Sequence, residues 1–170
     1  MENQKQSIKS LILLYGIILA VITILISVVK YAMGNHLERN VWESVFGIAL
    51  MIALTVYPIM LFKKGNNGFL NLSQSIKIGL GVAAVSGIIS IVYFFVFANY
   101  IEPEFAKQVM DAQMTEAIKQ NPTMSSADLE KGREMGQKFV MPMLYGGIIV
   151  VNLFLGFIIS LIAGLAMKKE

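Results

Sequence analysis

Four long stretches without a charged residue alternate with polar segments along the chain. They cover residues 11–29, 44–62, 78–101 and 139–167, with lengths of 19, 19, 24 and 29 residues. At ~1.5 Å per residue, helices of these lengths can cross a hydrocarbon core about 30 Å thick. The pattern predicts an all-α membrane protein in which four transmembrane helices form a bundle and a single domain, 1–170.

The fourth stretch is longer than a bilayer requires, since 29 residues reach roughly 43 Å as a helix. We expect the span itself at about 142–167, with the helix tilted or bent at Pro142. The other three stretches are expected to span over their whole length. Pro58, near the end of the second stretch, also removes a backbone hydrogen bond. Both prolines are expected to be tolerated kinks, and a hinge is the alternative.

The first stretch follows two lysines, Lys5 and Lys9, and a secretion signal also begins with basic residues. Its 19 apolar residues exceed the ~7–15 residues of a signal core. The nearest match to a cleavage site, Ala32-Met33-Gly34, is weak. We therefore expect an uncleaved first span.

The one sizeable polar segment is residues 102–138, between the third and fourth stretches. Apolar residues recur on one helical face of its first part, which predicts an amphipathic helix from about Pro103 to Gln120 on the membrane surface or against the bundle. Ser125 and Asp128 have the spacing of a capping box. A second helix is therefore expected to start near Ser126 and to continue into the fourth span, so that a helical hairpin covers about 103–138.

Small side chains repeat at every fourth position in three of the stretches. The stripes are Gly16-x3-Ala20, Gly79-x3-Ala83-x3-Gly87 and Gly156-x3-Ser160-x3-Gly164. Such stripes let helix backbones approach closely in lipid. We expect them to pair the helices within one bundle, and homodimerisation through one of them is the alternative.

Asn152 is the strongest polar group near the middle of a span. Its amide is expected to hydrogen-bond across helices, which contributes about 0.6 kcal/mol on average. The candidate partners are hydroxyl residues of the other stretches: Thr23, Ser27, Thr55, Ser86 and Ser90. A structural role is expected, and a polar binding site lined by Asn152 is the alternative.

Composition narrows the classes of function. The chain is 56% hydrophobic and 15% charged, with no cysteine and a net charge of +3. No titratable Asp, Glu, Lys, Arg or His lies within the four stretches, which argues against a proton-coupled pump and against intramembrane acid–base or metal catalysis. We expect no catalytic, metal or cofactor-binding residues. No basic patch with aromatic residues indicates a nucleic acid partner.

The only histidine, His36, is expected to be a solvated loop residue because no second histidine or cysteine accompanies it. Glu102 and Glu104 flank Pro103 and could form an acidic pair, but favourable charge at a helix start explains them equally. Methionine thioethers suit Cu(I), yet without His or Cys nearby an apolar role is expected for them.

The distribution of basic residues predicts the orientation. With four spans, residues 1–10, 63–77 and 168–170 share one side, which holds seven basic residues in 28, against seven in 51 on the other side. Short basic loops stay inside, so both termini are expected in the cytoplasm. The halves also echo each other, with Ser7-Ile8-Lys9 and Ser75-Ile76-Lys77, and a true repeat remains open.

Three short motifs carry a family resemblance: Leu14-Tyr15-Gly16, Ser75-Ile76-Lys77-Ile78-Gly79 and Tyr100-Ile101-Glu102-Pro103-Glu104-Phe105. With them, the chain resembles the small four-span bacterial membrane proteins of domain-of-unknown-function family forty-one ninety-nine, found in the Bacteroidota. The resemblance implies a multi-pass protein of the bacterial inner membrane, and it implies no activity.

We expect a non-enzymatic structural or partner-binding membrane component, which contacts the lipid bilayer and either a second copy or another membrane protein. The alternative is a small oligomeric transporter or channel subunit. A cavity that reaches Asn152 would favour transport, and a packed interior would favour a scaffold.

Overall fold

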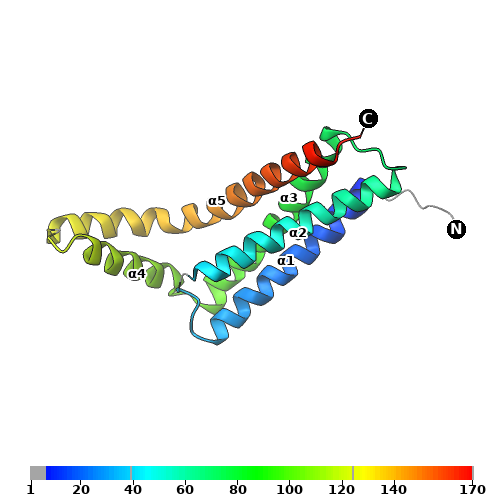
Figure 1. Ribbon diagram of the computed structural model, residues 1–170. Helices are drawn as coiled ribbons and strands as arrows, with labels where there is room; N and C mark the ends of the chain where they lie inside the picture. The colour runs from blue at the N-terminus through cyan, green and yellow to red at the C-terminus, as the bar shows by residue number, and fades with distance from the viewer. Residues whose placement is uncertain (1–6, 39, 124, 170) are drawn as a thin grey trace.

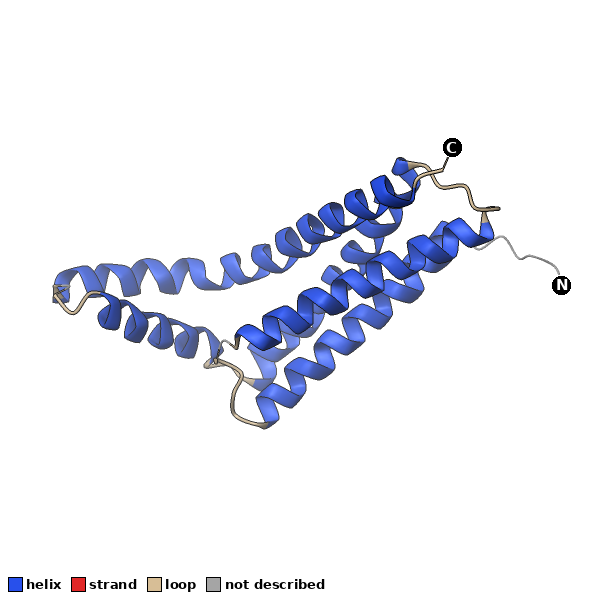
Figure 2. Ribbon diagram, in the orientation of Figure 1, coloured by secondary structure: helices blue, strands red, loops and turns tan. Residues whose placement is uncertain are grey.

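The computed structural model describes residues 7–38, 40–123 and 125–169, apart from the side chain of Ser126 (Figure 1). In chain order the elements are α1 (Ile8–Ala32), α2 (Val41–Gly65), α3 (Leu72–Val96), η1 (Phe97–Ile101), α4 (Phe105–Gln120) and α5 (Ser126–Met167). The element η1 is a π-helical turn that continues α3. These residues contain no strand, and their one β-type pairing is a single bridge between Leu70 and Lys169 (Figure 2).

Four helical segments are long and apolar enough to cross a membrane, namely α1, α2, α3 together with η1, and α5 from Ala127. The prediction of an all-α protein with four membrane-spanning helices is thus confirmed. The helices are longer than the uncharged stretches because their last turns include flanking lysines, such as Lys30 in α1 and Lys63 in α2. Lysine is favourable there, at the negative end of the helix dipole.

Local hydrogen bonds set the starts of α3 and α5. The Asn71 side chain accepts a hydrogen bond from the backbone N–H of Gln74 at 2.8 Å, and the Gln74 side chain accepts one from the Asn71 N–H at 3.0 Å. At the start of α5, the Ser125 hydroxyl accepts a hydrogen bond from the Asp128 N–H at 3.2 Å. The predicted helix start near Ser126 is confirmed, because this cap satisfies an otherwise unpaired N–H.

The second half of the chain agrees with the predicted continuation of the second helix into the fourth span, because α5 is one helix of 42 residues that runs through Pro142. The structure does not confirm the amphipathic hairpin expected at about 103–138, since its second helix is the first part of this long helix. A proline inside a helix removes one hydrogen bond but need not end it. At roughly 63 Å, α5 extends beyond the other three long helices and lies beside α4 (Figure 1). We call α4 and residues 126–140 the arm.

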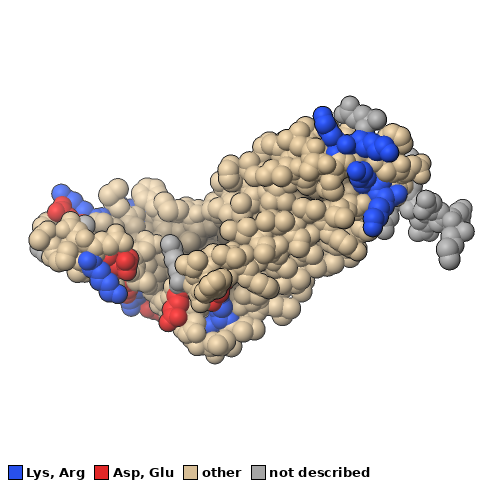
Figure 3. Space-filling view, viewed as in Figure 1, with Lys and Arg blue, Asp and Glu red and all other residues tan. Residues whose placement is uncertain are grey.

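The bundle has two different ends. At the lysine end lie the starts of α1 and α3 and the ends of α2 and α5, with their lysines gathered in Figure 3. There, Leu70 and Lys169 exchange two backbone hydrogen bonds of 3.0 Å, and the Lys63 ammonium donates to the Met167 carbonyl at 2.8 Å. At the opposite arm end, α1 leads into α2 and η1 leads into α4. We call the two corresponding parts of the bundle the lysine half and the arm half.

Packing is concentrated in the lysine half. The central helix, α3, packs mainly against α1 and α5. Fully buried side chains there include Ile59, Leu70, Ile78 and Val82. By contrast, all residues of four arm-half segments are described and none of them is buried: 21–32, 41–50, 88–96 and 141–155. The helices therefore separate toward the arm end, and this separation positions the candidate site.

Candidate functional site: a polar cavity within the bundle

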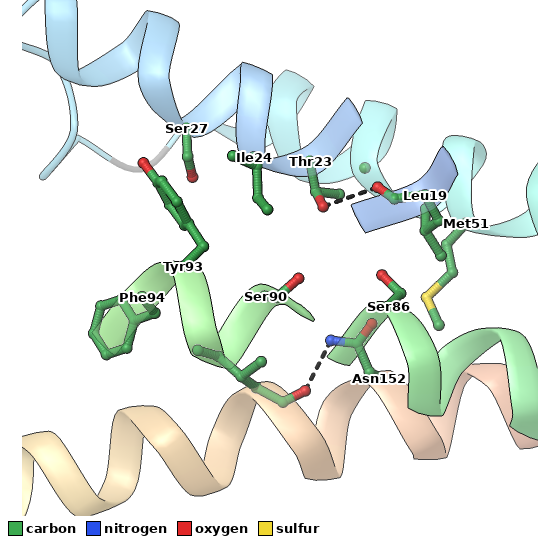
Figure 4. A pocket seen from close by; sticks show the side chains of 12 residues that line it. Leu19, Thr23, Ile24, Ser27, Met51, Ser86, Ser90, Tyr93, Phe94 and Asn152 are labelled. Atoms are coloured by element: carbon green, nitrogen blue, oxygen red, sulfur yellow. Dashed lines mark hydrogen bonds between the residues drawn. The ribbon is translucent and has the colours of Figure 1, made fainter. Parts of the chain in front are cut away.

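A cavity of about 280 Å³ lies between the four membrane-spanning helices, in the arm half (Figure 4). Each of the four helices contributes to its wall. The lining residues are Leu19, Thr23, Ile24, Ser27, Gly47, Met51, Ser86, Ser90, Tyr93, Phe94, Ile148 and Asn152. Asn152 and four of its five candidate partners therefore share one cavity, whereas Thr55 is buried outside it.

Two of the polar lining side chains donate hydrogen bonds to carbonyl groups of their own helices. The Asn152 amide donates to the Ile148 carbonyl at 2.8 Å, and the Thr23 hydroxyl lies 2.9 Å from the carbonyl oxygens of both Leu19 and Ala20 (Figure 4). The structure therefore does not show the predicted interhelical bond of Asn152. Within the described residues, its Oδ1 atom remains available as an acceptor that faces the cavity.

Ser86 is the most deeply placed hydroxyl of the site. Its side chain is only 1% exposed, and it forms no side-chain hydrogen bond with any of the described residues. Figure 4 shows its oxygen and the Asn152 amide directed into the same space, with Ser90 nearby on the same helix. A buried hydroxyl without a partner is costly, so Ser86 is suited to bond with a molecule that enters the cavity.

Glycine and the course of α2 explain why the cavity exists. No residue of α2 before Met51 is buried in the described structure, so the first turns of α2 stand away from α3. Gly47 on this segment has no side chain, and a Cβ placed there would meet no atom within 4 Å. On α3, a Cβ at Gly87 would lie 3.7 Å from that of Asn152, which is ordinary contact rather than close packing.

A second hollow, of about 470 Å³, adjoins the cavity between α1 and α2. It is lined by Thr23, Ile26, Trp42, Glu43, Phe46 and Gly47. Thr23 and Gly47 line both spaces, so the cavity and the hollow meet at these two residues. Glu43, at the end of the hollow, pairs with Lys30 across α1 and α2.

Aromatic rings close the cavity toward the arm end. Tyr93, from the cavity wall, stacks on Phe97 of η1 with ring centroids 6.1 Å apart. Phe94 meets Phe105 of α4 at 5.6 Å and Tyr145 of α5 at 5.1 Å, both edge to face. Such aromatic pairs favour this geometry. The cavity wall is therefore in direct contact with the base of the arm.

A polar network lies on the far side of these rings. The Tyr31 hydroxyl donates to Glu102 Oε2 at 2.9 Å, and the Gln108 amide donates to Glu102 Oε1 at 2.9 Å. His36 Nε2 lies 3.1 Å from Gln108 Oε1, while its Nδ1 is buried without a partner among the described residues. The expectation of a solvated His36 is wrong, because the loop folds its ring against Phe97. Sequence reasoning missed this network, since its partners lie about 70 residues apart.

Glu102 and its neighbour in sequence have separate partners. Glu104 is exposed and pairs with Lys107 one turn along α4, at 3.1 Å. The structure thus places the two carboxylates in different contacts, and Glu102 connects the end of α1 to the start of α4.

Two of the three predicted small-residue stripes, those on α3 and α5, meet each other mainly in the lysine half, whereas Gly16 of the third stripe packs against Val85 of α3. A Cβ at Gly79 would overlap Ser160, and one at Gly156 would lie 2.5 Å from Ala83 Cβ. A Cβ at Gly164 would lie 2.8 Å from Ser75 Cβ. The two prolines considered as kinks or hinges lie apart: Pro58 is buried within α2, and Pro142 is exposed on α5. Neither lines the cavity.

The cavity offers uncharged hydrogen-bonding groups. None of its lining residues carries a charge, and hydroxyl and amide groups alternate with apolar and aromatic side chains. Among the described residues, no group of three or more His, Asp or Glu side chains is arranged to hold a metal ion. The cavity is therefore suited to binding a neutral molecule.

Comparison with known proteins gives one match. A protein-family model described as "Protein of unknown function (DUF4199)" matches residues 14–169. Neither the curated proteins nor the solved structures contain a match.

Proposed function

The chain belongs to the DUF4199 family, and from that premise we propose that it is a non-enzymatic membrane protein that binds a small uncharged molecule within the bilayer, as a carrier or transporter subunit. The cavity at Asn152 carries this proposal. From the sequence, a packed interior would have favoured a scaffold and a cavity would favour transport. The hydroxyl of Ser86, which lines the cavity and forms no hydrogen bond with the described residues, supports binding.

We further propose that the protein lies in the bacterial inner membrane with both termini in the cytoplasm. The lysines at the ends of α2 and α5 support this orientation, because they gather at one end of the bundle (Figure 3) and basic residues favour the cytoplasmic side. The arm then projects from the opposite face.

Cysteine labelling tests whether the cavity admits a small molecule. The chain has no cysteine, so Ser86→Cys and Ser160→Cys each introduce a single thiol. The two serines are matched, with exposed fractions of 1% and 0%, but only Ser86 lines the cavity. In membranes, methyl methanethiosulfonate should modify Ser86→Cys at least tenfold faster than Ser160→Cys. Equal rates would remove the basis for the proposal.

The arm favours a second function, the docking of a partner protein by an amphipathic helical hairpin. The hairpin is held together before any partner binds: Arg133 pairs with Asp111, and a Cβ at Gly132 would lie 3.2 Å from Met114 Cε. Met135 remains 64% exposed on the arm. Here the partner is a second copy of the chain or another membrane protein.

Crosslinking tests the docking function. A photoactivatable residue at Met135, which is 64% exposed, can be compared with one at Phe154 in the span, which is 62% exposed. Docking predicts one discrete adduct in native membranes from position 135 and only a diffuse background from position 154. The same background from both positions would contradict it.

A further inference from the structure

We propose that the occupant of the cavity is an uncharged lipid with a hydroxyl headgroup, which enters sideways from the bilayer between α1 and α2. This inference rests on the proposed function, and it adds the ligand class and the route. The hydroxyl lies in the polar cavity near Ser86 and Asn152. The hydrocarbon chain passes Gly47 into the second hollow and out to the bilayer.

The hydrogen-bonding pattern of the cavity selects the headgroup. The Asn152 amide nitrogen donates one of its two hydrogens to Ile148, and its Oδ1 accepts no hydrogen bond from the described residues, so it remains as an acceptor. Ser86 has a hydroxyl proton that none of the described residues accepts. A hydroxyl headgroup satisfies both groups at once, since it donates one hydrogen bond and accepts another.

Charge and size exclude larger headgroups. No Lys, Arg, Asp or Glu lines the cavity, and an unpaired ion in such surroundings is strongly disfavoured. The volume of the cavity, about 280 Å³, is near the lower limit for ligand sites, which is roughly 300–1,000 Å³. A phosphate-bearing headgroup is therefore disfavoured by its charge.

The second hollow selects the hydrocarbon chain. Ile26, Trp42 and Phe46 give it a mainly apolar wall, with Glu43 at its end paired to Lys30, and it joins the cavity where Thr23 and Gly47 line both spaces. The hollow lies between α1 and α2, which are both long and apolar enough to cross a membrane, so the proposed route opens toward lipid. In the hollow, the chain exchanges lipid contacts for contacts with protein at little cost, and in the cavity Ser86 and Asn152 replace the hydrogen bonds that the hydroxyl makes at the membrane surface.

Fluorescence of the only tryptophan provides the test, because Trp42 lines the hollow. Purified protein in nanodiscs is titrated with 9,10-dibromostearyl alcohol, whose bromines quench tryptophan at short range. Phosphatidylcholine with the same brominated chains is the comparison. The alcohol should quench Trp42 saturably, and the phospholipid should give only a linear rise with mole fraction.

Three variants connect this signal to the geometry. Gly47→Leu fills the passage and Ser86→Val removes the free hydroxyl; each should weaken the apparent affinity for the alcohol at least tenfold. Gly146→Leu is the control, since a Cβ there also meets no atom within 4 Å but Gly146 lines neither space. It should bind like the wild type.

Each contrary outcome has a separate meaning. Saturable quenching by both probes would overturn the hydroxyl headgroup, and wild-type binding by Gly47→Leu would overturn the route. No saturable quenching, with Ser86→Cys still reactive, would overturn the lipid while leaving the proposed binding function intact. If Ser86→Cys is also unreactive, both proposals fail.

Discussion

In the lysine half of the bundle, a methyl group at Gly156 would lie 2.5 Å from Ala83 Cβ, whereas in the arm half one at Gly87 would lie 3.7 Å from Asn152 Cβ. Both glycines occupy positions of predicted small-residue stripes on the facing helices α3 and α5. Small residues permit close approach, but the approach occurs only where the helix axes remain together. Where the helices diverge, the same residues leave space.

The two halves also differ in how they use polar side chains. In the lysine half, the buried Ser75 hydroxyl donates to the Ser160 carbonyl of the neighbouring helix at 2.7 Å. In the arm half, Ser86 and Ser90 face a cavity instead. Lipid provides no hydrophobic force that would close a gap between helices. The lysine half therefore holds the bundle together, and the arm half is free to hold a ligand.

The largest expected effect comes from adding a methyl group to the close contact. Gly156→Ala should lower the free energy of unfolding by about 2 kcal/mol, because overpacking displaces Ala83 or the α3 backbone. Gly146→Ala, where a Cβ meets open space, should leave stability unchanged or raise it slightly. Unfolding in mixed SDS micelles, followed by protease sensitivity, measures both. Equal stability of the two variants would abolish the distinction between the halves.

The next largest effect tests whether the polar network around Glu102 anchors α4 to the bundle. Glu102→Ala removes the acceptor of Tyr31 and Gln108. Hydrogen bonds to a carboxylate contribute about 1.5–3 kcal/mol each when buried; partial exposure reduces the total to about 1–2 kcal/mol. Amide hydrogen exchange in α4 should accelerate roughly five- to thirtyfold, with the lysine half unaffected.

Glu104→Ala is the matched control for this prediction. Its carboxylate is 65% exposed and pairs with Lys107 inside α4, and surface pairs of this kind contribute little. Exchange in α4 should therefore remain near the wild-type rate. If Glu104→Ala accelerates exchange as much as Glu102→Ala, the polar network does not anchor the arm.

The contrast between the halves also shows which structural features could be predicted from the sequence. Uncharged stretches predicted four spans because the cost of burying charge in lipid acts on each helix alone. The Ser125 cap is equally local. The cavity depends on where α2 diverges from α3, and the contact of His36 with Gln108 joins residues 72 positions apart. No local pattern encodes such distances.

A smaller effect distinguishes the two uses of serine. Ser75→Ala removes the hydrogen bond to Ser160 in a fully buried position and should cost about 1 kcal/mol of unfolding free energy. Ser90→Ala, in the cavity wall, removes no hydrogen bond to the described residues and should cost less than about 0.5 kcal/mol. The same unfolding assay compares them. A larger loss from Ser90→Ala would mean that the arm half is packed in the membrane.

The smallest effect is expected at Gly87, and its sign is opposite to that of the effect at Gly79. Gly79 and Gly87 lie two helical turns apart in one stripe of α3. A methyl group at Gly79 overlaps Ser160, so Gly79→Ala should destabilise the protein. At Gly87 the nearest atom is 3.7 Å away, so Gly87→Ala gains contact and helix propensity and should stabilise by about 0.5 kcal/mol. Opposite signs in the unfolding assay would show that one motif packs the helices at one end and lines a cavity at the other; losses of equal size would mean that α3 and α5 are close along their whole contact.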